Sequence, residues 1–260
     1  MSIGLHPSSA GADHTLARQV AAHLAVAAAI AAGAGAALGE ALGMPVPYAA
    51  GSLAVFLLVA ANAARGLPLH APHRRWGDAN RVTLARGVLI SLVGGALAVI
   101  PHLGAAGLWA VSAIAVMALA LDGADGWVAR RQRMSSEYGA RFDMGLDTLL
   151  TLILALLLWR LGEAGPWVLL AGLLRHLFVL AGMAVPRLQG RLPFSQRRRV
   201  VCVVQIAALA AGLTPLVGPP WTGLAAGAAL GLLLFSFLVD TVWLLRQDGR
   251  PDVTHSEGRI

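Results

Sequence analysis

The stretch LDGADGWVARRQRMSSEYGARFDMGLD, residues 121–147, places four aspartates where two long apolar segments meet. Asp122 and Asp125 lie three residues apart, and Asp143 and Asp147 lie four residues apart, so each pair occupies one face of a helix. The sequence between the pairs is short and basic, which predicts that the two helices are antiparallel neighbours. We therefore expect the four carboxylates to converge on one space.

Apolar segments long enough to cross a bilayer recur along the whole chain. Hydrophobic residues make up 57% of its 260 residues and charged residues only 13%, against about 25% in ordinary soluble domains. This composition predicts an all-α fold, a polytopic bundle of about eight transmembrane helices. The expected spans are residues 18–38, 47–64, 82–100, 106–128, 142–160, 165–184, 199–216 and 221–244.

The distribution of basic residues predicts how the chain is oriented in the membrane. All twenty are arginines, and eighteen of them fall on one side of the predicted topology. By the positive-inside rule this side, with both termini, faces the cytoplasm of a cell (inner) membrane. The formal charge of +7 then reflects topology and attraction to anionic membrane lipid, so we expect no nucleic-acid partner. The single cysteine, Cys202, excludes an internal disulfide.

Four carboxylates in one space repel each other and resist removal from water, so they need compensating positive charge. Divalent cations would supply it, and hard oxygen ligands favour Mg²⁺ or Mn²⁺, with two ions bridging a phosphate. Gly126 and Gly139 would let a ligand approach the backbone, and Arg130 offers a planar fork for phosphate oxygens. The alternative is a structural cluster in which the aspartates pair with Arg131, Arg141 and Arg130.

Eight of these positions resemble the signature of the CDP-alcohol phosphatidyltransferase family, D-x2-D-G-x2-A-R-x8-G-x3-D-x3-D. Every spacing is matched, by Asp122, Asp125, Gly126, Ala129, Arg130, Gly139, Asp143 and Asp147. Two further stretches are similar to the family. Asn80, Thr83 and Arg86 follow its N-x2-T-x2-R entry to the first core helix, and the arginines at 197–199 with Gln205 follow its basic stretch. The usual Gly-Lys and Thr of that stretch are absent, with Val201 and Cys202 instead.

The resemblance implies an enzyme of phospholipid biosynthesis that transfers a phosphatidyl group from CDP-diacylglycerol to an alcohol and releases CMP. It implies that Asp122, Asp125 and Asp143 bind metal, and that Asp147 is both a ligand and the catalytic base. The CDP site would comprise Gly126, Ala129, Arg130, Gly139, Asn80 and Thr83. It also implies a homodimer within the membrane.

The acceptor alcohol stays open among glycerol 3-phosphate, inositol phosphate, serine, choline and another phosphatidyl lipid, and we favour glycerol 3-phosphate. A phosphorylated acceptor would suit several arginines, although the positive-inside rule explains most of them equally well. The candidates are Arg133, Arg141, Arg175, Arg191 and Arg199.

The resemblance divides the chain into three parts and leaves two rival functions. Residues 1–66 form a pair of helices outside the family core, residues 67–246 form a six-helix catalytic core, and residues 247–260 form a cytoplasmic tail. A divalent-cation transporter could use the same acidic cluster, but its site would lie at the middle of the membrane rather than at helix ends. A catalytically silent membrane scaffold would not need the intact signature.

Overall fold

Helices make up nearly all of the regular structure in the computed structural model, which describes residues 9–67, 76–132, 137–190 and 195–246. Side chains at 9–15, 124–132, 137, 186 and 189 are outside this description. The described part contains eight α-helices and no strand. They are α1 (Ser9–Ala41), α2 (Pro47–Gly66), α3 (Asp78–Gly95), α4 (Ala105–Gln132), α5 (Glu137–Arg160), α6 (Leu170–Ala184), α7 (Gln196–Gly212) and α8 (Trp221–Arg246). Short 3₁₀ turns occur at Ala96–Ala98, Ile100–His102, Pro166–Leu169 and Pro186–Gln189.

Seven of the eight described helices are long and apolar enough to cross a membrane, so the chain is a membrane protein with the predicted all-α class. The exception is α7, which has 17 residues and opens with the polar sequence QRRR. At 1.5 Å per residue it covers about 26 Å, slightly less than the ~30 Å hydrocarbon core. The predicted span 199–216 therefore corresponds to a helix that begins three residues earlier and ends at Gly212.

Other helix bounds differ from the predicted spans where a helix begins with polar residues or ends at a glycine. The helix α5 begins at Glu137, five residues before the predicted position 142, because its first turns are polar. The helix α3 ends at Gly95, and 3₁₀ turns carry the chain from there to His102. Glycine at the end of α3 and Pro101 in the second turn both disfavour a continuous helix.

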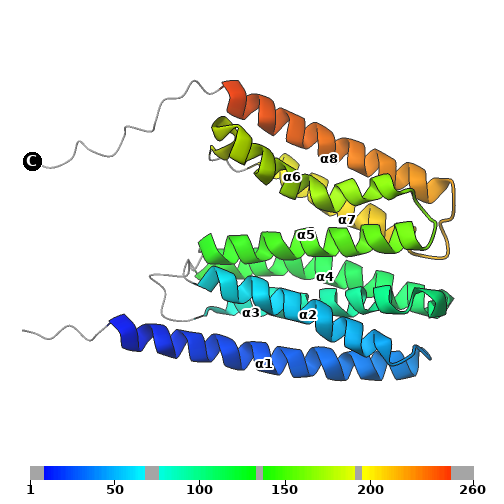
Figure 1. Cartoon of the computed structure of the whole chain (residues 1–260), viewed down its shortest axis with the longest axis horizontal. Helices are drawn as coiled ribbons and strands as arrows, with labels where there is room; N and C mark the ends of the chain where they lie inside the picture. The colour runs from blue at the N-terminus through cyan, green and yellow to red at the C-terminus, as the bar shows by residue number, and fades with distance from the viewer. Residues whose placement is uncertain (1–8, 68–75, 133–136, 191–194, 247–260) are drawn as a thin grey trace, which may run out of the picture.

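The helices run side by side from α1 at one edge of the molecule to α8 at the other (Figure 1). The most deeply buried candidate span is α3, which packs against α1, α2, α4 and α5. Glycines on α3 permit the close approach of α2. A Cβ atom at Gly87 would lie 2.6 Å from Val59 Cγ1, and one at Gly94 would lie 2.7 Å from Val55 Cγ2. The close packing of α2 thus depends on the missing side chains of α3.

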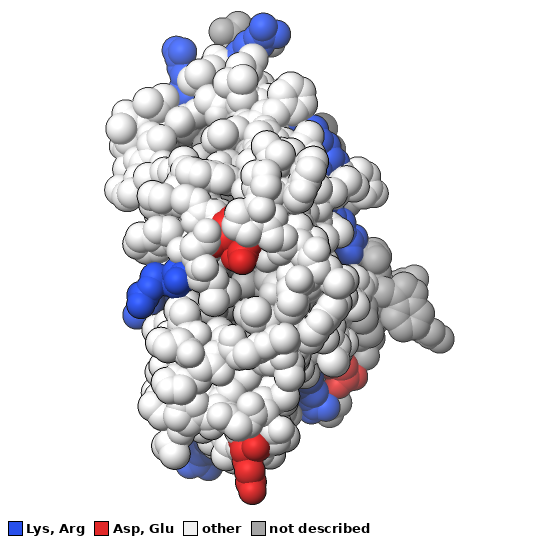
Figure 2. All heavy atoms as spheres, turned by 90° about the vertical axis from the view of Figure 1, so that its right-hand side faces the viewer, with Lys and Arg blue, Asp and Glu red and all other residues white. Residues whose placement is uncertain are grey.

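The two ends of the bundle differ in charge. The end that carries the α1–α2, α3–α4, α5–α6 and α7–α8 connections shows few charged side chains among mostly uncharged ones (Figure 2). The opposite end holds the first turns of α3, α5 and α7, where the arginines and aspartates of the sequence motifs lie. Polar chemistry is therefore gathered at one end of the helices.

Candidate metal and substrate site

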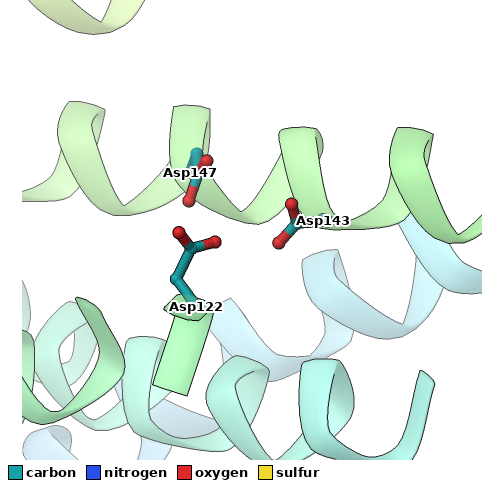
Figure 3. Close-up of side chains that lie close together, drawn as sticks. All are labelled: Asp122, Asp143 and Asp147. Carbon is teal, nitrogen blue, oxygen red and sulfur yellow. The ribbon is translucent and has the colours of Figure 1, made fainter. Parts of the chain in front are cut away.

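Three of the four motif aspartates meet where α4 and α5 face each other. Asp122 lies at the end of the apolar part of α4, and Asp143 and Asp147 project from successive turns of α5 (Figure 3). One carboxylate oxygen from each lies within 4.8 Å of those of the other two. The four-residue spacing of Asp143 and Asp147 places both on one face of α5, as the sequence predicted.

Several predicted site residues fall outside the side chains that the structure describes. The backbone of α4 continues as far as Gln132, but the side chains of Asp125, Ala129 and Arg130, and the surroundings of Gly126, are among those left out. Arg133, Arg191 and the predicted tail at 247–260 lie outside the described residues altogether. Their roles stay predictions.

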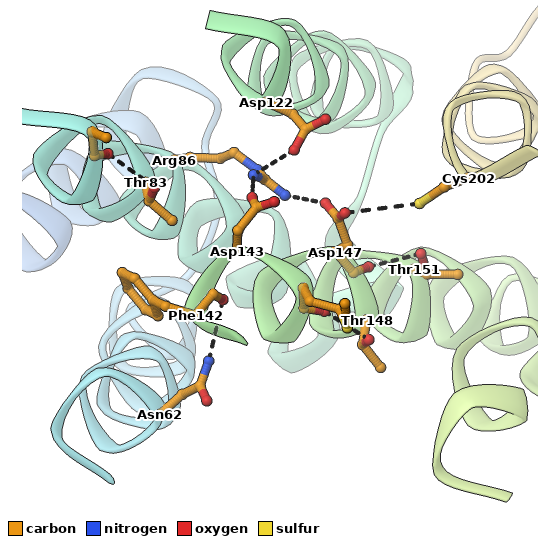
Figure 4. A network of polar contacts seen from close by, with 12 residues as sticks. Asn62, Thr83, Arg86, Asp122, Phe142, Asp143, Asp147, Thr148, Thr151 and Cys202 are labelled. Carbon is orange, nitrogen blue, oxygen red and sulfur yellow. Dashed lines mark hydrogen bonds and ion pairs between the residues drawn. The ribbon is translucent and has the colours of Figure 1, made fainter. Parts of the chain in front are cut away.

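A buried arginine lies at the centre of the three aspartates (Figure 4). Arg86 Nη1 donates to Asp122 Oδ1 at 2.8 Å and also to Asp143 Oδ1, while Nη2 donates to Asp147 Oδ1. The Arg86 side chain has no exposed surface, whereas the three aspartates keep between 15% and 35% of theirs. The guanidinium therefore holds the carboxylates together from the protein side and leaves them partly open on the other.

Arg86 belongs to the N-x2-T-x2-R stretch but was not among the predicted site residues. Its position in an apolar segment could have identified it, because burying an arginine there costs free energy unless its charge is paired. Its partners could not be read from the sequence, since they lie 36, 57 and 61 residues further along the chain.

The cluster suits a divalent cation. Among the described side chains, three carboxylates carry three negative charges and Arg86 one positive charge, which leaves two negative charges, the charge that one Mg²⁺ or Mn²⁺ ion balances. Two oxygens on one Mg²⁺ lie at most about 4.2 Å apart at ~2.1 Å bond lengths. The three carboxylate oxygens lie within 4.8 Å of one another, so small side-chain rotations would bring them to one ion. All three donors are hard carboxylate oxygens, which these ions prefer.

A cavity of about 970 Å³ opens in front of this cluster, between α3–α5 and α6–α8. Its lining is apolar for the most part, including Leu119, Phe178 and Phe237. It brings together residues from five helices that the sequence analysis had selected. These are Asn80, Thr83, Asp122, Gly139, Asp143, Asp147, Arg175 and Arg199. Arg141 instead lines a smaller pocket between α2 and α5.

The far wall of the cavity carries a second ion cluster, formed by α7 and α8. Arg197 Nη2 donates to Asp240 Oδ1 at 2.5 Å, and Arg197 Nη1 donates to the Ser236 carbonyl oxygen at 3.1 Å. Arg198 Nη1 lies 3.6 Å from Asp240 Oδ2. Asp240 was not among the predicted site residues, although a single carboxylate within the otherwise apolar α8 is the kind of residue that marks a site.

Between the two clusters, α7 presents Cys202 and Gln205 to the cavity. Cys202 Sγ lies 3.9 Å from Asp147 Oδ2, in position for a weak S–H donor. Gln205 is 1% exposed, and neither polar atom of its amide has a hydrogen-bond partner among the described residues. Leaving a buried amide unpaired costs about 1–3 kcal/mol. This residue is therefore the most direct candidate for contact with a bound substrate.

Comparison with protein families agrees with this site. A family model described as CDP-alcohol phosphatidyltransferase matches residues 76–242, well over half of the chain. No curated protein and no solved structure gives a match to the chain. The chain belongs to the CDP-alcohol phosphatidyltransferase family, whose members are membrane-embedded transferases acting on CDP-alcohols. The match starts at Trp76, so α1 and α2 lie outside it and α3 to α8 carry nearly all of it.

Proposed function

We propose that the protein transfers a phosphatidyl group from CDP-diacylglycerol to a small phosphorylated alcohol and releases CMP. The observation that carries this proposal is the opposite charge of the two walls of one cavity. Asp122, Asp143 and Asp147 line one wall, and Arg199 and Arg175 line the other. Acidic groups suit a donor that arrives with divalent cations, and arginines suit a second phosphate. The apolar remainder of the lining suits acyl chains.

The acidic wall would bind the donor diphosphate. Asp122, Asp125 and Asp143 would hold the ions, with Asp147 completing the set. Mg²⁺ or Mn²⁺ would neutralise the diphosphate and make CMP a better leaving group. Arg86 orients the carboxylates, because it donates to one oxygen on each of the three described ones. Asn80, Thr83, Gly126, Ala129, Arg130 and Gly139 would line the CDP site.

Asp147 is the proposed base. It lies one helical turn further into the bundle than Asp143, on the same face of α5, and it lines the cavity. From there its carboxylate would take the proton of the acceptor hydroxyl as that oxygen attacks the β-phosphorus, and the CMP oxygen would leave on the opposite side. A positioned base of this kind contributes about 10²–10⁴-fold to the rate.

The basic wall would select the acceptor. Neither Arg175 nor Arg199 makes an ion pair with another described residue, so both guanidiniums are available to an anion. A phosphate monoester is well matched to an arginine fork. Glycerol 3-phosphate is therefore our preferred acceptor, ahead of serine or choline, which carry no phosphate. Arg133 and Arg191 stay candidates for the same role, while Arg141 lines a separate pocket.

The remaining parts of the proposal concern placement and organisation. The positive-inside rule would place the arginine-rich end of the bundle, the site and both termini in the cytoplasm of the inner membrane. A lipid donor could then enter sideways while a soluble acceptor arrives from the cytosol. We also propose a homodimer, and the division into residues 1–66, 67–246 and 247–260 given by the sequence.

The test is a transfer assay with purified protein in detergent. Labelled CDP-diacylglycerol and Mg²⁺ or Mn²⁺ are supplied with each acceptor alcohol in turn, and CMP release and the lipid product are measured. We expect one phosphorylated acceptor to yield product, chelation to abolish CMP release, and either ion to restore it. Full activity in excess chelator would overturn the metal mechanism, and turnover with an uncharged alcohol alone would overturn the acceptor assignment.

A further inference from the structure

A second, smaller pocket lies between α2 and the first turns of α5, outside the cavity described above. Its volume is about 190 Å³, and the residues around it are Asn62, Arg65, Gly66, Tyr138, Arg141 and Phe142. Three of these six described residues belong to α2, which lies outside the residues that the family model matches. The pocket is therefore built jointly by the N-terminal helix pair and the helix that carries Asp143 and Asp147.

The lining of this pocket is positive. Among the residues that the structure describes there, two are arginines and none is acidic. Both arginines are exposed, and Arg65 makes no ion pair with any residue that the structure describes. Asn62 adds an amide at the pocket wall. Two guanidiniums at one small space form a donor set for the oxygens of a phosphate group.

The depth of the pocket along the helices indicates where such a phosphate would come from. The candidate span in α2 ends at Gly66, and the candidate span in α5 begins at Tyr138. Both residues line the pocket. The pocket thus lies where two apolar spans end, which is the level of lipid headgroups rather than of acyl chains or of bulk water. Basic pockets between transmembrane helices at this level commonly hold anionic headgroups.

We propose that this pocket binds the phosphate of an anionic phospholipid headgroup, held by Arg65 and Arg141. The ligand is a structural lipid of the surrounding membrane, distinct from the donor and acceptor in the large cavity. Its acyl chains would run along α2 and α5 toward the apolar part of the bundle. The proposal concerns binding alone and does not depend on the proposed transferase reaction.

Binding here would act on the helix that carries two of the motif aspartates. Asn62 Nδ2 donates to the Phe142 carbonyl oxygen at 3.5 Å, one residue before Asp143. A Cβ atom at Gly145 would lie 2.3 Å from Asn62 Nδ2, so α2 and α5 touch closely just beside the pocket. On the other side, Trp76 Nε1 donates to the Tyr138 hydroxyl at 3.1 Å. A headgroup bridging α2 and α5 would therefore fix the start of α5 against the N-terminal pair.

The test is lipid binding by native mass spectrometry of delipidated protein in a neutral detergent. The protein is titrated with phosphatidylglycerol, with phosphatidylcholine, or with inorganic phosphate. We expect tight binding of phosphatidylglycerol to wild type. Binding should weaken about a hundredfold in Arg65→Gln/Arg141→Gln, since each of the two lost charge-assisted hydrogen bonds is worth about tenfold. Arg65→Lys keeps the positive charge but loses the planar guanidinium. Its affinity for phosphatidylglycerol should lie between those of wild type and the double variant.

The matched control removes two exposed arginines elsewhere, with Arg187→Gln/Arg246→Gln. If that variant loses as much phosphatidylglycerol as the pocket variant, the attraction is a general effect of charge and the site is refuted. Equal binding of phosphatidylcholine would also refute it. Inorganic phosphate that binds as tightly as the lipid would overturn the headgroup assignment. Thermal unfolding of each variant checks the fold, and Arg65→Lys keeps the proposal testable if the double variant is unstable.

Discussion

The two ion clusters that face the cavity are built from the same groups in opposite proportion. Among the described residues of α3, α4 and α5, one arginine, Arg86, contacts three aspartates. On α7 and α8 a single aspartate, Asp240, lies against Arg197 and Arg198. The first cluster retains a surplus of negative charge and the second a surplus of positive charge. Each is partly neutralised within the protein, so each can remain inside an apolar bundle and still attract a ligand of opposite charge.

The clusters also differ in burial. The Arg86 side chain is completely enclosed, whereas those of Arg197 and Arg198 are 30% and 31% exposed. Removing one partner of an enclosed ion pair strongly destabilises the fold, because it leaves the other charge buried without a partner. Exposed ion pairs contribute little to stability, because water and salt screen them. Substitutions in the acidic cluster should therefore have large effects, and substitutions in the basic cluster small ones.

The largest effect is expected from the aspartates themselves. Asp122→Asn should lose donor binding and turnover together, because an amide is a poor replacement for a charged metal ligand. Asp147→Asn should keep metal and donor binding and lose on the order of 10²-fold or more in rate, the usual loss when a general base is removed. Calorimetric binding of Mn²⁺ and of CDP-diacylglycerol, measured beside CMP release, separates the two. If Asp147→Asn loses as much metal affinity as Asp122→Asn, Asp147 is mainly a metal ligand. If Asp147→Asn keeps near-normal turnover, Asp147 is neither the base nor an essential ligand.

The next effect is on stability, at Arg86. Arg86→Met should lower the free energy of unfolding by about 3–5 kcal/mol in chelator, since it leaves three carboxylates without their countercharge. Added Mg²⁺ should recover more stability in this variant than in wild type, because the cation takes over that charge. Unfolding in detergent, with and without the ion, measures both quantities. Unchanged stability in chelator would show that Arg86 is not the countercharge.

A smaller effect is expected on acceptor binding, at Arg199. Arg199→Gln should raise the KM for a phosphorylated acceptor about tenfold, the loss of one charge-assisted hydrogen bond, and leave the KM for CDP-diacylglycerol unchanged. Stability should not change measurably, because Arg199 makes no ion pair with another described residue. Steady-state kinetics with each substrate varied separately would show this. A rise in the donor KM would move Arg199 to the donor site.

Gln205 lies between the two clusters and offers a test of direct substrate contact. Gln205→Leu should raise a substrate KM several-fold, roughly the 1 kcal/mol of one neutral hydrogen bond, while the protein becomes no less stable. The reason is that its amide has no hydrogen-bond partner among the described residues, so folding loses nothing when the amide is removed. Kinetics and thermal unfolding of the same preparation provide the comparison. Reduced stability with unchanged KM values would assign Gln205 a structural role instead.

The smallest effect is expected at Asp240. Asp240→Asn removes the carboxylate that partly neutralises Arg197 and Arg198, so the basic wall becomes more positive. The KM for a phosphorylated acceptor should fall by about twofold to threefold, in line with the weak energies of partly exposed pairs. The effect should disappear at high salt, where such pairs are screened. A fall in turnover as large as that of Asp122→Asn would contradict the distinction between the two clusters.

The sequence by itself determined the class of fold and the meeting of three of the four motif aspartates. Helical periodicity and apolar run lengths depend on local residue order, so eight helices, the membrane location and the shared face of Asp143 and Asp147 could all be predicted. The signature also identified the family, which the match over residues 76–242 confirms. Bounds were less accurate where polar residues open a helix, as at the start of α5.

Only the tertiary structure decided which distant charges meet. Arg86 lies on α3 and its partners on α4 and α5, and Asp240 lies 43 residues after Arg197. Spacing within a helix says nothing about such pairs, because they depend on how helices pack and rotate against one another. Packing also assigned Arg141 to a pocket shared with α2 rather than to the large cavity. The local sequence thus determines which side chains lie on each helix face. Helix packing decides which faces meet, because the neighbours that enclose a charged group in a bundle come from distant parts of the chain.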